Sequence, residues 1–299
     1  MMKSLSILIP TFNDVCLELA SQLSTQAVAI NELEYEILVA DDGSTDADVV
    51  KANSAIDALL RCRYIRREEN VGRSAIRNFL AQTAQYERLL FVDGDMKMTR
   101  ADFVRKYVET EGPLLYGGYV VEGNEAQLKD NLRFIYEKKS EADHTAEKRQ
   151  LKPYADFHTS NFLIERDLYL QHPLDTRFRH YGYEDVLLGK ELKKAGVPIR
   201  HIDNPLAFAT FEDNRHFVEK TEEGIRTLVT FKEDLEGYSR LLALAEKLKH
   251  MGVSGIVRAV YNKRSDKWRN NLCGSHPSLS LFKWYKLGYL LQQLAERQA

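Results

Sequence analysis

The sequence predicts an α/β protein whose mostly parallel sheet is flanked by helices. Through the first half of the 299-residue chain, apolar runs of about four to six residues alternate with helical patterns of roughly 10–15 residues. Three of the apolar runs end directly in a polar cluster, at the place where a loop crosses from a strand to a helix. This alternation is typical of βαβ units, in which helices cover both faces of a parallel sheet.

Each strand of the first half is indicated by its own apolar run. The runs LSILI, YEILVA and LLFV are rich in β-branched and large aliphatic residues, and a shorter run covers 63–65. The segments between them carry helical patterns, and Ser44 or Asp46 can cap the second helix. We therefore expect strands at 5–9, 35–40, 63–65 and 89–92, and helices at 14–30, 46–60 and 72–82.

The second half of the chain has fewer strand signals. A strand is expected at 114–121, where Gly117-Gly118 would let another group approach the backbone closely. Short strands are expected at 162–164 and 199–202. Helical patterns cover 124–150, 184–195, 217–249 and 280–298.

The composition is that of a folded protein with two parts. Hydrophobic residues make up 44% of the chain and charged residues 29%, which argues against a disordered or collagen-like chain. Strand signals nearly vanish beyond about residue 215. We expect residues 1–213 to form an α/β domain and residues 214–299 to form a helical C-terminal extension.

Charge and cysteine content exclude some classes of protein. Lys and Arg total 42 and Asp and Glu 44, so the formal charge of −2 argues against a generally basic nucleic-acid binder. The three cysteines match no zinc or disulfide pattern, which favours a reducing compartment. The N-terminal run reads as a strand rather than a signal peptide, and no stretch approaches the roughly 18–20 apolar residues of a membrane span. We expect a cytoplasmic protein.

The C-terminal residues 250–299 differ in charge from the rest of the chain. They carry a formal charge of +6, whereas residues 1–249 carry −8. Aromatic residues such as Trp284 and Tyr285 lie among the basic ones. Two interpretations stay open, namely peripheral contact with the anionic inner face of a membrane, and a basic helix packed on the domain or on a second copy in a homo-oligomer.

The polar clusters suggest a ligand site at one edge of the sheet. They are Pro10-Thr11-Phe12-Asn13, Asp41-Asp42-Gly43-Ser44 and Asp93-Gly94-Asp95, and each follows a strand run. Taken singly, each could be a turn or a helix cap, but ligands of open α/β sheets bind where such loops meet.

Asp93 and Asp95 suit a divalent cation. Two carboxylates around a glycine can turn toward one Mg²⁺ or Mn²⁺ ion, which prefers oxygen ligands and leaves positions for diphosphate oxygens. The chain has no GxxxxGK[ST] or GxGxxG loop to hold phosphate.

A second constellation is Gly182-Tyr183-Glu184-Asp185, which opens a predicted helix. Acidic residues in a first helical turn also stabilise the helix dipole, so capping is one interpretation. The other is a general base that deprotonates a hydroxyl. Adjacent helical residues diverge by about 100°, so only one of Glu184 and Asp185 would act directly and the other would orient or cap.

In order and spacing, several stretches resemble the inverting family 2 glycosyltransferases of the GT-A fold. The resemblance covers roughly residues 4–205. In this region the sequence is similar to bacterial members that build surface polysaccharides and to the transferase domains of chondroitin-type polymerases. The matching stretches are LSILIPTFND, EILVADDGSTD, ENVGRSAIRN, LLFVDGDM and NFLIERDLYLQ…FRHYGYEDVLLGKELKKAG.

The resemblance implies a hexosyl- or N-acetylhexosaminyltransferase that moves a sugar from a UDP-sugar to a hydroxyl of a glycan or lipid-linked glycan. Asp185 would be the base, with Glu184 fixing the acceptor hydroxyl, and Mn²⁺ or Mg²⁺ would bind at Asp95 and Asp93. Thr11 and Asp42 would hold uridine, and Arg73 or Arg77 would contact base or phosphate. The donor-binding residues implied are Pro10, Thr11, Asn13, Asp42, Arg73, Arg77, Asp93 and Gly94.

One position departs from the family pattern. Related sequences often place a metal- or diphosphate-binding histidine after the strand that follows the Glu-Asp helix, where this chain has Phe208. His216 would replace it from the following segment, or the ligand is missing. His201 is a further candidate, although a lone histidine beside a strand is more often structural.

Two other functions stay open. A sugar nucleotidyltransferase would need a Gly-rich, basic loop in place of PTFND. A nucleotide-sugar-binding module without activity would have no physical reason to keep Asp93, Asp95 and Asp185 together.

Overall fold

The computed structural model describes residues 2–297, which divide into two compact units. The first unit comprises the chain up to residue 122 together with 143–179 and 184–210, and the second comprises 123–142, 180–183 and the chain from 211 onward. The predicted domain limits, 1–213 and 214–299, stay predictions.

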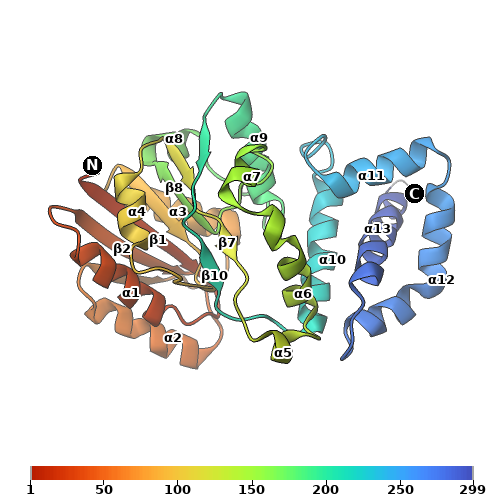
Figure 1. Cartoon of the computed structure of the whole chain (residues 1–299), viewed down its shortest axis with the longest axis horizontal. Coiled ribbons are helices and arrows are strands. Elements are labelled where there is room, and N and C mark those ends of the chain that lie inside the picture. Colours follow the sequence, from red (N-terminus) through yellow and green to blue (C-terminus); the bar gives the residue numbers. More distant parts are fainter. Residues whose placement is uncertain (1, 298–299) are drawn as a thin grey trace. The chain divides into compact units, whose positions relative to one another are not determined.

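The first unit is built on a central sheet with the order β3-β2-β1-β4-β8-β6-β9, to which seven strands of the described chain contribute. Figure 1 labels β1, β2 and β8 of this sheet. The pairs of β1 with β2 and β4, of β2 with β3 and of β6 with β9 are parallel, whereas β8 runs antiparallel to both of its neighbours. The predicted α/β class with a mostly parallel sheet is therefore confirmed. The strands are β1 Ser4–Thr11, β2 Glu34–Asp41, β3 Cys62–Arg66, β4 Arg88–Val92, β6 Leu114–Tyr116, β8 Asn161–Glu165 and β9 Ile199–His201.

Helices flank this sheet, and α3 shows how they bury it. Ile76 and Leu80 of α3 join Leu8, Leu38 and Phe91 of the central strands in one buried apolar cluster. Nearly every residue of β1 is buried, as expected for a strand that is covered on both faces. The helices of this unit are α1 Leu17–Val28, α2 Ala47–Ser54, α3 Arg73–Thr83, α4 Phe103–Glu109, α7 Ala146–Gln150, α8 Arg166–Gln171 and α9 Glu184–Lys194.

The prediction of one strand over 114–121 is wrong. The chain leaves the central sheet after β6 and enters a second, three-stranded sheet as β7, Tyr119–Val120. Between them, Gly118 has φ +83°, and a Cβ at Gly117 would lie 2.4 Å from the carbonyl oxygen of Asn204. The close backbone approach expected of the two glycines thus breaks the strand. The other strands of the small sheet are β5 Met96–Lys97 and β10 Leu206–Phe208.

Asn161 joins the two sheets. Its side-chain amide donates to the carbonyl oxygens of Gly118 and Asn204 at 2.8 and 2.9 Å, and its Oδ1 accepts from the Tyr107 hydroxyl at 2.8 Å. The residue is fully buried, so these bonds satisfy the side chain within the protein. Asn161 is therefore a structural residue of the scaffold beneath the site.

The second unit is helical. A buried cluster that includes Leu132, Val218, Tyr261, Phe282 and Tyr285 forms its core. No helix within residues 2–297 combines the length and apolarity that crossing a membrane requires. Its helices are α5 Glu125–Leu128, α6 Leu132–Ser140, α10 Asn214–Thr230, α11 Arg240–His250, α12 Ser254–Leu272 and α13 Leu279–Glu296.

One helical expectation for this unit is wrong, and one helix was not predicted. The segment 217–249 is two helices, because the chain leaves α10 after Thr230 and restarts at Ser239, whose hydroxyl caps α11. Helix α12 had no sequence signal, since Tyr261 and Leu272 are its only residues that are buried within the described chain. Such a sparse apolar pattern does not show helical periodicity.

Candidate active site

The three polar clusters meet at the carboxyl ends of β1, β2 and β4. Thr11 of β1 lies opposite Asp41 of β2, and the amide of Asp42 donates to the Thr11 carbonyl at 2.9 Å. The amide of Gly94, after β4, donates to the Pro10 carbonyl at 3.2 Å. The parallel sheet therefore places these residues side by side, as predicted.

Gly94 permits a close contact with β1. A Cβ at this position would lie 2.8 Å from Cys16 Sγ and 3.1 Å from the Thr11 side chain. Thr11 is buried, and its hydroxyl donates to the Asp14 carbonyl at 3.1 Å. Gly94 thus lets the turn after β4 pack tightly against Thr11 of β1.

Asp42 holds the loop that precedes α3. Its two carboxylate oxygens accept from the backbone N–H groups of Val71 and Gly72, each at 2.9 Å. Burial raises the pKa of Asp42, although these two hydrogen bonds act in the opposite direction. The carboxylate therefore shapes the loop that leads into α3, whose first residue is Arg73.

Asn13 connects two loops. With φ +57°, it accepts from the amides of Thr45 and Asp46 at 2.9 and 3.0 Å through Oδ1, and its own amide donates to Ser44 Oγ at 2.8 Å. The structure thus shows Asn13 organising the loops after β1 and β2. Its predicted contact with a donor stays a prediction.

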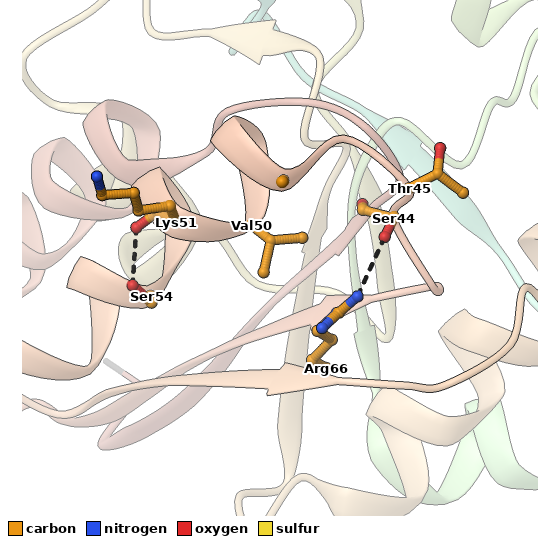
Figure 2. A pocket seen from close by; sticks show the side chains of 7 residues that line it. Ser44, Thr45, Val50, Lys51, Ser54 and Arg66 are labelled. Atoms are coloured by element: carbon orange, nitrogen blue, oxygen red, sulfur yellow. Dashed lines mark hydrogen bonds between the residues drawn. The ribbon is translucent and has the colours of Figure 1, made fainter.

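A pocket of about 290 Å³ lies beside the loop after β2 (Figure 2). Arg66 donates to the Ser44 carbonyl at 3.4 Å, and Lys51 from α2 adds a second cationic side chain to the lining. None of the predicted site residues lines this pocket. Its lining residues are Ser44, Thr45, Ala47, Val50, Lys51, Ser54 and Arg66.

A chain of ion pairs links the end of β4 to α9. Asp93 pairs with Arg77 through Oδ1, and with Arg73 through Oδ2 at 3.3 Å. Arg73 also reaches Glu184 Oε1, with 2.9 Å between Nε and the oxygen. The structure therefore brings four predicted site residues into one network, in which two guanidinium groups face two carboxylates.

Glu184 and Asp185 lie differently, as the helical geometry requires. Glu184 is 5% exposed, and its Oε2 has no hydrogen-bond partner among the described residues. Asp185 points instead to His158, with 2.7 Å between Oδ2 and Nδ1, and its Oδ1 accepts from the Val186 amide at 2.8 Å. Tyr183, directly before them, has φ +73°, an uncommon conformation that clusters at functional sites.

Asp185 is held in its charged form despite its burial. Burial raises the pKa of this carboxyl group, but the hydrogen bond and charge of His158, the Val186 amide and Arg73 outweigh it, so the net pKa is below its usual range. A carboxylate that is ionised at neutral pH and still able to accept a further hydrogen bond can act as a base.

Asp95 lies next to the small sheet. Its backbone carbonyl accepts from Ala209 at 2.9 Å, one residue after Phe208, whose ring packs against Tyr119. In residues 2–297, no group of three or more His, Cys, Asp or Glu side chains is placed to hold a metal ion. Phe208 stands where the family pattern expects histidine, so its apolar ring, next in sequence to the Ala209 contact with Asp95, supplies no metal ligand.

The two candidate histidines differ. His201 is buried, with 2.9 Å between its Nε2 and the Pro153 carbonyl, to which it donates, and its Nδ1 accepts from Arg149 at 3.3 Å. Burial lowers the pKa of His201 to about 4, and the bonds fix it as a neutral structural side chain. His216 is exposed in the first turn of α10, and its predicted role as a metal ligand stays a prediction.

Sequence reasoning missed two residues of this region, His158 and Arg149. Arg149 is buried and donates to the carbonyl oxygens of Gly117 and Ile202 at 3.1 and 3.0 Å. His158 contacts Asp185 across 27 residues of sequence. Neither belongs to a motif, and the charged stretch around Arg149 resembles a solvated helix face.

A profile of the family described as "Glycosyl transferase family 2" matches residues 6–171, more than half of the chain. Over 240 residues, or 68% of the chain, the sequence is 27% identical to a chondroitin synthase of Pasteurella multocida (strain Pm70). The matched part is only 24% of that relative's length.

Solved structures share the fold. The mannosyltransferase PcManGT of Pyrobaculum calidifontis, in complex with GDP-Man and Mn²⁺, aligns with a TM-score of 0.57 at 14% identity, covering 98% of this chain and 86% of that one. TarS 1–349 of S. aureus aligns with a TM-score of 0.51 at 14% identity, covering 100% of this chain and 91% of that one. Glucosyl-3-phosphoglycerate synthase of Mycobacterium tuberculosis, in complex with Mn²⁺ and UDP, aligns with a TM-score of 0.50 at 17% identity, covering 76% of this chain and 79% of that one. The predicted GT-A fold is thereby confirmed.

The ion-pair network predicts unequal effects of its two arginines on stability. Arg77→Met leaves the buried Asp93 with one partner, so we expect the free energy of unfolding in urea to fall by about 3 kcal/mol. Arg73→Met is the matched comparison, because its side chain is 40% exposed whereas that of Arg77 is 2% exposed. We expect Arg73→Met to lower the free energy of unfolding by about 1 kcal/mol or less. Equal losses would show that burial does not set the strength of the network.

Proposed function

This chain belongs to glycosyl transferase family 2, and we propose that it transfers a sugar from a UDP-sugar to a hydroxyl of a glycan or lipid-linked glycan with inversion at the anomeric carbon. The observation that carries the proposal is the path from Asp93 through Arg73 to Glu184, which sets the predicted donor site beside the Glu184-Asp185 pair. The relative named chondroitin synthase supports a glycan acceptor.

The proposed reaction is a single displacement. The acceptor hydroxyl gives its proton to the Asp185 carboxylate as its oxygen forms a bond to the anomeric carbon, and the bond from that carbon to the diphosphate breaks with its electron pair leaving on UDP. The Glu184 Oε2, buried and without a partner among the described residues, can accept a second hydrogen bond from the acceptor sugar and orient it.

We propose that Asp95 is the direct ligand of Mn²⁺ or Mg²⁺. The two oxygens of Asp93 are already paired with arginines, and these arginines are in turn balanced by Asp93 and Glu184. The network therefore offers little net positive charge to a diphosphate. The donor chemistry fits a hard cation that takes one or two carboxylates and otherwise phosphate and water oxygens, and such an ion would supply electrostatic stabilisation of the leaving diphosphate.

UDP is proposed as the donor nucleotide from the sequence resemblance, and the M. tuberculosis neighbour, whose structure holds UDP and Mn²⁺, supports it. Its likeness concerns the fold alone at 17% identity. Pro10, Thr11, Asn13 and Asp42 are the residues proposed to contact the nucleoside.

We also propose that the second unit contacts an anionic membrane surface. Around the turn between α11 and α12, Met251 and Ile256 are 61% and 66% exposed, and Leu244 and Val260 are exposed nearby in sequence. Their neighbours include several exposed cations that form no ion pair within the described residues. These basic residues are Lys247, Lys249, Lys263, Arg264 and Lys267. Apolar side chains flanked by unpaired cations match the chemistry of an anionic lipid interface.

Replacing the base tests the proposed reaction. Asp185→Asn keeps the shape of the side chain but cannot take the proton, so we expect transfer to fall by about 10²- to 10⁴-fold while UDP binding is retained. Asp167→Asn, an exposed acid in the first turn of α8, is the matched control and should keep wild-type transfer. Near wild-type transfer by Asp185→Asn would rule out the assigned base.

Vesicle binding tests the membrane surface. Met251→Ser/Ile256→Ser should weaken co-sedimentation with phosphatidylserine-containing vesicles about ten-fold, because two apolar side chains no longer enter the interface. Leu60→Ser, at an equally exposed leucine of the first unit, should bind as wild type does. If wild type binds neither anionic nor phosphatidylcholine vesicles, or if the double variant abolishes a dimer in sedimentation velocity, the surface serves packing between copies instead.

A further inference from the structure

The contact between His158 and Asp185 lies outside every motif in the sequence. We propose that His158 is a positioning residue for sugar transfer: its imidazole holds Asp185 in the orientation and charge state in which that carboxylate takes the acceptor's proton. This inference rests on the proposed function above and assigns to it a residue from a different part of the chain.

Asp185 is anchored at both of its oxygens. Oδ1 accepts from the Val186 amide at 2.8 Å and Oδ2 lies 2.7 Å from His158 Nδ1. Because an ionised carboxylate can only accept, His158 must carry its proton on Nδ1. The carboxylate plane is thus fixed by two donors, and a free lone pair on each oxygen can still accept the hydrogen of a substrate hydroxyl.

His158 is itself held by the core. The preceding residue, Phe157, is 1% exposed, and its ring packs edge-on against Phe162 of β8 and Tyr116 of β6. The His158 ring lies 6.1 Å from the ring centroids of both Tyr116 and Tyr119. Its side chain is 36% exposed, so the imidazole borders solvent while its backbone is fixed by buried neighbours. A ring held in this way can orient Asp185 rather than follow it.

The surroundings explain why Asp185 needs a donor. Burial raises the pKa of the carboxyl group, and the hydrogen bond and charge of His158 are the largest effects that lower it. Arg73 lowers it further from α3. Other titratable groups close to the pair include Tyr116, Tyr119, His144, Asp156 and His201.

The sign of the pH effect follows. In the wild type the pKa of Asp185 is lowered, so the base stays ionised as the pH falls through the mildly acidic range. Without His158, only the Val186 amide and Arg73 still counteract the effect of burial, so the pKa of Asp185 rises. The acid limb of the rate profile must then move to higher pH, because the base is protonated earlier.

Two substitutions separate positioning from packing. His158→Ala removes the donor, and we expect kcat to fall about ten-fold or more, the KM for UDP-sugar to stay the same, and the acid limb to shift upward in pH. His158→Asn places an amide N–H near the position of Nδ1, so it should restore most of kcat. His250→Ala, at an exposed histidine of α11, is the control and should match the wild type.

A measurement without turnover keeps the inference separate from the proposed function. In ¹⁵N-edited NMR of histidine-labelled protein, the Nδ1 proton of His158 should give a downfield signal that Asp185→Asn removes and Asp167→Asn leaves in place. If Asp185→Asn retains transfer, the assigned base fails. If Asp185→Asn loses transfer while His158→Ala keeps the wild-type kcat and pH profile, the proposed function stands and the role of His158 is wrong.

Discussion

The candidate site is held together by the ion pairs that Asp93 forms with the buried Arg77 and with the partly exposed Arg73. They fix the end of β4 to α3, and through Arg73 they reach Glu184 at the start of α9. A buried carboxylate is tolerated only when it is paired, so each member of the network holds the others in place. Since the charges within it balance, the network gives the site rigidity but little net positive potential. Because of this balance, we propose a divalent ion at Asp95 to neutralise the diphosphate.

The scaffold supports these charges with satisfied backbone and side-chain bonds. Asn161 and the Gly117-Gly118 break hold the two sheets together, and Gly94 lets the loop after β4 press against Thr11. The charged groups lie in α3, at the start of α9 and directly after β4, and not on long loops. On the other side of α9, His158 keeps Asp185 ionised. Two neighbouring residues of α9 thus make different contacts, Glu184 with Arg73 and Asp185 with His158.

The sequence predicted what depends on local pattern. The runs LSILI, YEILVA and LLFV became β1, β2 and β4, and the polar residues after them converge because carboxyl ends of parallel strands share an edge. Contacts between residues that are far apart in the sequence leave no local pattern from which they could be predicted. Arg73 meets Glu184 across 111 residues, and His158 stands in no motif. Helix α12 buries too few residues to show helical periodicity. Over 114–121, the apolar run does not reveal that the chain passes from one sheet to the other at Gly117-Gly118.

Calorimetric titration of UDP with and without Mn²⁺ shows whether a cation carries the binding of the diphosphate. If the ion-pair network is balanced and Asp95 holds the cation, wild-type binding should weaken by at least about 100-fold when EDTA replaces Mn²⁺. Asp95→Ala should then bind UDP equally weakly in both conditions, whereas Asp48→Ala, an exposed acid on α2, should behave as wild type. UDP binding of the same affinity in Mn²⁺ and in EDTA would show that no cation at Asp95 is needed to bind the diphosphate.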